Sequence, residues 1–128
     1  MQPLVYIIVL NWNDHIATLR CLESLKTITY SNYKIVVIDN GSINGSVQKL
    51  CSINDIELIC NDQNKGFAGG NNIGIKKAIE QGAGYVWLLN NDATAEANCL
   101  EKLVNAAEQD STIGLISPVI YDDQDISK

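Results

Sequence analysis

Polar side chains recur at four points along this chain, each directly after a short apolar run. The polar segments are residues 11–14, 39–42, 61–70 and 90–92. Each of them opens with Asn or Asp, whose oxygen and amide groups suit hydrogen bonding to a polar ligand. The same residue types make ordinary turns and helix caps, which is the simpler explanation for any one segment. Four such segments on one edge of a sheet favour a shared ligand site.

Two carboxylates in these segments have distinct chemical uses. Asp39 can accept hydrogen bonds from ribose hydroxyls or from the imide N–H of a pyrimidine base; its alternative role is an Asx turn with Asn40 and Gly41. Asp92, two residues after Asn90, can hold a divalent cation that keeps waters and is otherwise ligated by phosphate oxygens. A helix cap is the alternative role for Asp92.

A glycine-rich segment, residues 64–74, follows the third apolar run. It is neither a G-x-G-x-x-G nor a Walker A sequence, which disfavours dinucleotide binding. Its glycines permit close backbone approach to a ligand, and Asn71 and Asn72 offer amides where a helix is predicted to begin. Trp12, in the first polar segment, is a candidate for stacking on a base or sugar, whereas Trp87 lies within an apolar run and is expected in the core.

Alternating strands and helices must position these segments. The predicted strands are residues 4–10, 34–38, 56–60, 85–89 and 113–117. Predicted helices lie between them, with a weak one over 47–53 and another over 70–81. Apolar stripes mark two further helices at Ile16, Leu19, Leu22 and Leu25, and at Ala97, Leu100, Leu103, Val104 and Ala107. The pattern predicts an α/β fold with a mostly parallel sheet and helices on both faces, in which ligands bind beyond the carboxyl ends of the strands.

Length and composition predict one globular domain over residues 1–128, with 121–128 frayed. The net charge of −6 disfavours a nucleic acid partner. The longest apolar run is too short for a transmembrane segment and no signal peptide is recognisable, so a cytoplasmic protein is expected. The four cysteines are expected in apolar surroundings as reduced thiols.

At these residues the chain resembles the family 2 glycosyltransferases of the GT-A (Rossmann-like) fold, and in particular their bacterial rhamnosyltransferase-like members. The segments that carry the resemblance are 9–13, 37–42, 64–74 and 88–92, in the same order and at similar spacing. The resemblance implies an enzyme that transfers a sugar with inversion from a dTDP- or UDP-sugar, dTDP-rhamnose being one such donor. The acceptor would be a polysaccharide or a lipid-linked carbohydrate of the cell envelope, met in the cytoplasm or at the inner face of the membrane.

The resemblance also assigns site residues. The nucleotide-sugar-binding residues would be Asn11, Asn13, Asp39, Gly66, Asn72 and Asn91. Asp92, with Asn90, occupies the place of the family's D-x-D motif and would bind Mg²⁺ or Mn²⁺ bridging the diphosphate. Asn90 departs from that motif by removing one formal negative charge.

The family's general base is an Asp or Glu of the acceptor-binding half, so it is expected beyond Lys128. The fragment is therefore predicted to be truncated before that half, to bind the donor without completing transfer, and to self-associate through uncovered apolar surface. A non-catalytic α/β interaction module is the alternative hypothesis. A dinucleotide-dependent oxidoreductase is disfavoured, because residues 11–14 lack a glycine fingerprint after the first run.

Overall fold

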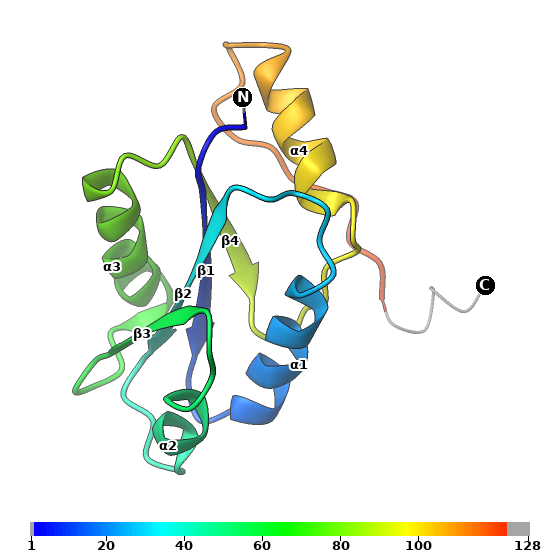
Figure 1. Cartoon of the computed structure of the whole chain (residues 1–128). Helices are drawn as coiled ribbons and strands as arrows, with labels where there is room; N and C mark the ends of the chain where they lie inside the picture. Colours follow the sequence, from blue (N-terminus) through cyan, green and yellow to red (C-terminus); the bar gives the residue numbers. More distant parts are fainter. Residues whose placement is uncertain (1, 123–128) are drawn as a thin grey trace.

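The fold is a four-stranded parallel sheet with helices on both faces, given by a computed structural model that describes residues 2–122 (Figure 1). The strands are β1 (Val5–Asn11), β2 (Tyr33–Asp39), β3 (Ile56–Cys60) and β4 (Tyr85–Asn90). The helices are α1 (His15–Leu25), α2 (Ser46–Leu50), α3 (Gly66–Glu80) and α4 (Cys99–Glu108). The strand order is β3-β2-β1-β4, which confirms the predicted α/β class.

Side chains of the central strand β1 alternate between two apolar layers. Val5, Ile7 and Val9 pack with buried residues of α1, α2 and α4 on one face. Tyr6 and Ile8 pack with α3 on the other face. Because both faces of β1 are buried, its sequence is continuously apolar. Figure 1 shows α3 on one side of the sheet and α1 and α4 on the other.

The register of the strands brings the polar segments to a single edge. Asn11 pairs with Asp39 across β1 and β2, and Leu10 pairs with Asn90 across β1 and β4. The ends of β1, β2 and β4 therefore lie side by side, at the lower edge of the sheet in Figure 1. This arrangement is the one that the sequence predicts for a ligand site.

The predicted fifth strand is wrong. Residues 113–117 form no strand, and the Leu115 side chain is 97% exposed. The apolar run has strand propensity, but a strand also needs a hydrogen-bonded neighbour, and within residues 2–122 β4 pairs only with β1. The predicted fraying of 121–128 falls mostly outside the described residues; Tyr121 and Asp122 belong to no helix or strand.

Two helical predictions also need correction. The helix predicted from residue 70 begins at Gly66, where a φ of +77° suits glycine. Ile16 was placed in the buried stripe of α1 but is 75% exposed. The buried face of α1 instead follows Ala17, Cys21 and Leu25, which are spaced four residues apart.

The cysteines are all free thiols, but only part of them lies in apolar surroundings. Cys21 is buried and Cys99 is half-buried, whereas Cys51 and Cys60 are exposed. Cys51 follows the short helix α2, whose buried anchor is Leu50, and Cys60 ends the edge strand β3. The prediction was therefore wrong for these last two. Across residues 2–122, no helix combines the length and apolar content needed to cross a bilayer.

Candidate functional site

A buried hydrogen-bond network joins the ends of β1 and β2. Asp39 is 1% exposed and its carboxylate accepts hydrogen bonds from Asn11 Nδ2 at 2.9 Å, from Ser42 Oγ at 2.7 Å and from Ser42 N at 2.9 Å. Both oxygens of the Asp39 carboxylate are therefore engaged within the protein. The Asx-type turn considered for Asp39 is thus present, formed with Ser42.

Asn13 binds the neighbouring loop to this network. It adopts a φ of +52°, its backbone N–H donates to Ser42 Oγ at 2.8 Å, and its side-chain oxygen accepts from Ile43 N at 2.8 Å. The loop after β1 and the loop after β2 are therefore held as one unit.

Asn40 performs the same function for the segment that leads into α3. Its side-chain oxygen accepts from Lys65 N at 3.0 Å and from Asn61 Nδ2 at 3.1 Å. Its Nδ2 donates to Asn64 Oδ1 and to the Gly66 carbonyl, both at 3.1 Å. Because Asn40 is only 2% exposed and uses both ends of its amide, its role is to fix this segment.

A chain of hydrogen bonds runs from the network across the sheet to the end of β4. Asn91 Nδ2 donates to Thr18 Oγ1 at 3.1 Å, and Thr18 Oγ1 donates to Asn11 Oδ1 at 2.6 Å. Asn11 then donates to Asp39, as described above. Asn91, the residue next to Asp92, is thereby connected through Thr18 and Asn11 to Asp39, the residue predicted to bind the nucleoside.

The end of β4 faces an open cavity of about 410 Å³. Its lining residues are Leu10, Trp12, Asp14, Phe67, Asn71, Leu88, Leu89, Asn90, Asn91 and Asp92. Trp12 and Phe67 are 54% and 63% exposed, so two aromatic faces are available to a ligand. The cavity combines apolar walls with a few polar groups, as small-molecule sites do.

The predicted metal ligands Asn90 and Asp92 are exposed on this cavity. Residues 2–122 contain no cluster of three His, Cys, Asp or Glu side chains suited to a metal. One carboxylate and one amide oxygen still match the needs of Mg²⁺, which commonly binds through one or two carboxylates together with waters and substrate phosphates. The donor set therefore fits a cation that arrives with a diphosphate.

Cys21 supports the backbone beneath these ligands. Burial raises the pKa of the Cys21 thiol to about 11, with a smaller contribution from the negative charge of Asp92. The thiol therefore stays protonated at neutral pH. Its Sγ lies 3.7 Å from the Asn90 carbonyl oxygen, to which it donates a hydrogen bond.

The other predicted site residues lie in the cavity, in the adjoining hydrogen-bond network, or outside both. Asn91 lines the cavity, while Asn11, Asn13 and Asp39 belong to the adjoining network. Gly66 and Asn72 are exposed at the start of α3 and are not among the residues that line the cavity. Their roles, like those of the other assigned residues, stay predictions.

The glycines of α3 serve a different purpose from the one first considered. A Cβ at Gly70 would lie 2.5 Å from Leu10 Cδ1, and one at Gly74 would lie 2.8 Å from Ile8 Cδ1. These two glycines let the helix backbone approach β1 closely. Sequence reasoning attributed this freedom to the approach of a ligand, since the partner of a glycine is not visible in sequence.

The sequence predicts no ligand role for Asn40 or Thr18, and the resemblance assigns Asn72 to the site and not Asn71, although Asn71 is the one of the two that lines the cavity. Asn40 had a usable signal, because it is an amide directly after a strand. Thr18 lies within a helix and gives no such signal. Asn71 is 4% exposed and its Nδ2 has no hydrogen-bond partner among the described residues.

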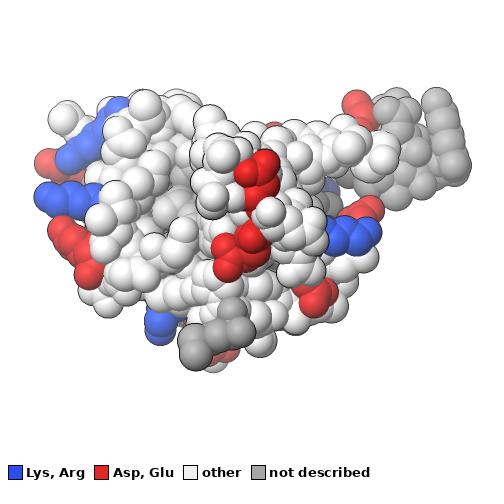
Figure 2. Space-filling view, turned by 90° about the horizontal axis from the view of Figure 1, so that it is seen from above, with Lys and Arg blue, Asp and Glu red and all other residues white. Residues whose placement is uncertain are grey.

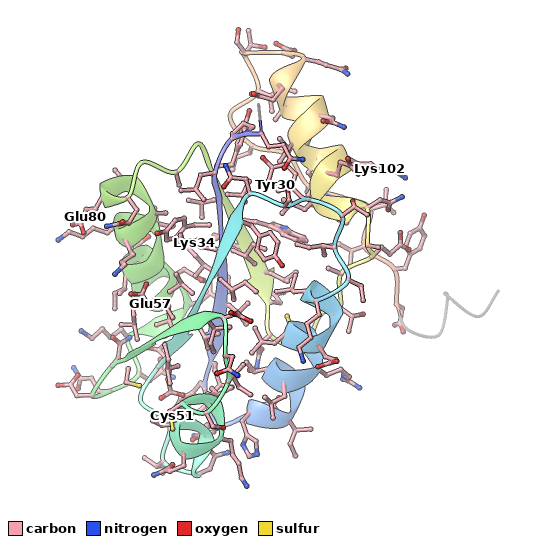
Figure 3. All side chains as sticks on the ribbon, viewed as in Figure 1. Tyr30, Lys34, Cys51, Glu57, Glu80 and Lys102 are labelled. Carbon is pink, nitrogen blue, oxygen red and sulfur yellow. The ribbon has the colours of Figure 1, made fainter. Side chains whose placement is uncertain are left out.

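A second hollow, of about 690 Å³, lies where β2 and β3 begin and α3 ends. Two of its charged groups pair with each other: Lys77 Nζ lies 2.7 Å from Glu57 Oε1, and this hydrogen bond raises the pKa of Lys77. Figure 3 shows Lys34 and Glu57 on this part of the sheet. Seen from the edge where the strands begin (Figure 2), acidic and basic side chains are mixed and no continuous basic surface is visible. The cavity at the end of β4 is therefore the better candidate site.

The fold of this chain is the GT-A fold of glycosyltransferases. It superimposes on S. aureus TarS 1-349 in complex with UDP with a TM-score of 0.69 and 18% identity, covering 85% of this chain and 32% of that one. Mannosyltransferase PcManGT from Pyrobaculum calidifontis, in complex with GDP-Man and Mn²⁺, gives a TM-score of 0.68 and 22% identity, with 84% of this chain and 32% of that one covered.

The sequence places the chain more narrowly. The family model described as glycosyl transferase family 2 matches residues 6–128, so the chain belongs to that family. It is 27% identical over 127 residues to the dTDP-rhamnosyl transferase RfbF of Shigella flexneri. The alignment covers 99% of this chain and 42% of that protein. The chain thus spans about two fifths of this relative's length, and the resemblance to rhamnosyltransferase-like members is confirmed.

Proposed function

We propose that this chain binds the nucleotide-diphosphate sugar used by a family 2 glycosyltransferase. The observation that carries the proposal is the cavity at the end of β4, where exposed Asp92 and Asn90 lie with the aromatic side chain of Trp12. A sugar nucleotide presents the groups that such a site suits, namely phosphates for a bound cation and a base or sugar ring for an aromatic face.

Within this proposal, the chain's own residues orient the donor. Asp92 and Asn90 would hold Mg²⁺ or Mn²⁺, which when bound would offset negative charge on the departing diphosphate. Asp39, Asn11 and Asn13 would position the nucleoside beside them. The hydrogen-bond chain through Thr18 fixes the spacing between these two parts of the site.

Proton removal from the acceptor needs a further group. Among residues 2–122, the carboxylates that line the cavity are those of Asp14 and Asp92. Asp14 accepts a hydrogen bond from Ala17 N at 3.2 Å as the N-cap of α1, and Asp92 is assigned to the cation. We therefore propose that a base outside these 128 residues deprotonates the acceptor hydroxyl, that transfer inverts the anomeric centre, and that residues 1–128 alone bind the donor without completing transfer.

The donor and acceptor are proposed from the relatives. The name of the Shigella flexneri relative points to a dTDP-sugar, and the TarS complex contains UDP, so both nucleotides are candidates. A carbohydrate or lipid-linked acceptor in envelope polysaccharide synthesis would follow, with the protein in the cytoplasm or at the inner face of the membrane. Self-association is proposed through the exposed apolar side chains of Leu115, Val119 and Ile120.

Calorimetric titration with dTDP and with UDP, each with and without Mn²⁺, tests donor binding. We expect nucleotide binding that strengthens with Mn²⁺ and weakens at least about tenfold in Asp92→Ala. Glu80→Ala is the matched control, because Glu80 is an exposed acidic residue at the far end of α3 (Figure 3). Absence of binding to either nucleotide, at any Mn²⁺ concentration, would contradict the proposal and favour a non-catalytic interaction module.

A further inference from the structure

Asn71 lines the cavity and carries a buried, unused hydrogen-bond donor, its Nδ2 atom. The residue is 4% exposed, lies in the second turn of α3 and lines the cavity with Asp92 and Trp12. Within the described part of the chain, Asn71 Nδ2 is the one buried side-chain nitrogen or oxygen that has no hydrogen-bond partner. The neighbouring amides of Asn11 and Asn40, in contrast, are engaged at both ends.

The position of Asn71 is fixed by the close contact of α3 with β1. Gly70 leaves no room for a side chain against Leu10, and Gly74 leaves none against Ile8. The helix is therefore packed against β1 at two points, one residue before Asn71 and three residues after it. Asn72, the adjacent amide, is exposed instead.

An amide in this setting needs an acceptor that the protein does not supply. A buried N–H without an acceptor is costly, and an apolar side chain of the same size would fill the position without that cost. Because Asn71 lines the cavity, a turn of its side chain would let an oxygen of a bound molecule serve as this partner. Because an amide nitrogen carries donors and no acceptor, it selects ligand oxygens such as those of phosphates, hydroxyls or carbonyls.

We propose that Asn71 Nδ2 donates a hydrogen bond to an oxygen in the sugar-diphosphate portion of the bound donor. This inference rests on the proposed function, since it assumes that the cavity at the end of β4 takes a nucleotide sugar. It assigns to Asn71 the polar contact on the α3 side of the cavity, opposite the ligands contributed by the segment after β4.

Two substitutions of Asn71 test this contact. Asn71→Leu keeps a similar volume and removes the donor, and Asn71→Asp keeps the shape but places a negative charge near phosphate. With Mn²⁺ present, we expect the affinity for a dTDP- or UDP-sugar to fall about tenfold in Asn71→Leu and further in Asn71→Asp. The melting temperature of Asn71→Leu should be unchanged or higher. Asn105→Leu and Asn105→Asp, on the exposed face of α4, are the matched controls and should retain wild-type affinity.

The ligand oxygen is identified by comparing two probes. If the Asn71 variants also lose affinity for the free nucleotide, dTDP or UDP, the contact lies on the diphosphate. If they lose affinity only for the sugar nucleotide, the contact lies on the sugar. Wild-type affinity for both probes in both Asn71 variants would overturn this inference and leave the proposed function intact. Failure of the wild-type chain to bind either probe would overturn both. Should Asn71→Leu not fold, the nearly isosteric Asn71→Asp decides alone.

Discussion

The two halves of the carboxyl edge of the sheet are built differently. At the ends of β1 and β2, Asn11, Asp39 and Asn40 are at most 2% exposed. Their side chains form hydrogen bonds that join neighbouring loops. At the end of β4, Asn90 and Asp92 are exposed, and the Asn71 amide nitrogen has no hydrogen-bond partner in the described part of the chain. The closed half uses its polar groups to fix loops, and the open half keeps them available. We infer that rigidity in the first half positions ligand-binding groups in the second.

The largest difference between the halves should appear in stability. Asn40→Ala removes four hydrogen bonds made by a side chain that is 2% exposed, so we expect the free energy of unfolding to fall by about 2–4 kcal/mol. Asn90→Ala, in the open half, should change it by less than about 0.5 kcal/mol. Urea unfolding followed by circular dichroism measures both values. Equal losses in the two variants would remove the distinction between the halves.

A smaller effect is expected where the halves are joined. Thr18→Val keeps the shape of this buried side chain but breaks the hydrogen-bond chain from Asn91 to Asn11. We expect about 1–2 kcal/mol lower stability and a several-fold weaker affinity for nucleotide with Mn²⁺, because Asp92 loses its anchored neighbour.

Thr18→Ser retains the hydroxyl and is the control for Thr18→Val. It should recover most of the nucleotide affinity, even if loss of the methyl group lowers stability. If both variants bind nucleotide equally well, Thr18 has a structural role alone and the two halves are not coupled through it.

The strands were predictable because their apolar, β-branched runs are continuous. The prediction of 56–60 matches β3 (Ile56–Cys60). β4 extends one residue beyond its prediction, and β1 and β2 each differ from prediction by one residue at both ends. Residues 113–117 have a similar composition, yet no neighbouring strand pairs with them in the described structure. Strand formation depends on such partners, which local sequence does not reveal.

The site was predictable at the level of segments and less so at the level of atoms. Asn90, Asn91 and Asp92 were placed at the cavity, because polar residues after a buried parallel strand reach that edge of the sheet. The first turn of α3 was missed, since three of the first five residues of the helix are glycine, which has low helix propensity. The burial of Asn71 beside the exposed Asn72 follows from helix packing, which an isolated pair of amides does not specify.

The central claim, that a cation and the diphosphate of the nucleotide share the open half, is tested most directly by two-dimensional ¹H–¹⁵N NMR with trace Mn²⁺. In the presence of dTDP or UDP, we predict paramagnetic broadening that is strongest at the backbone amides of Asn90 to Asp92 and at the Trp12 indole N–H. Resonances near Glu80, at the far end of α3, should stay sharp. Broadening centred away from the end of β4, or the same broadening without nucleotide and in Asp92→Ala, would contradict the account.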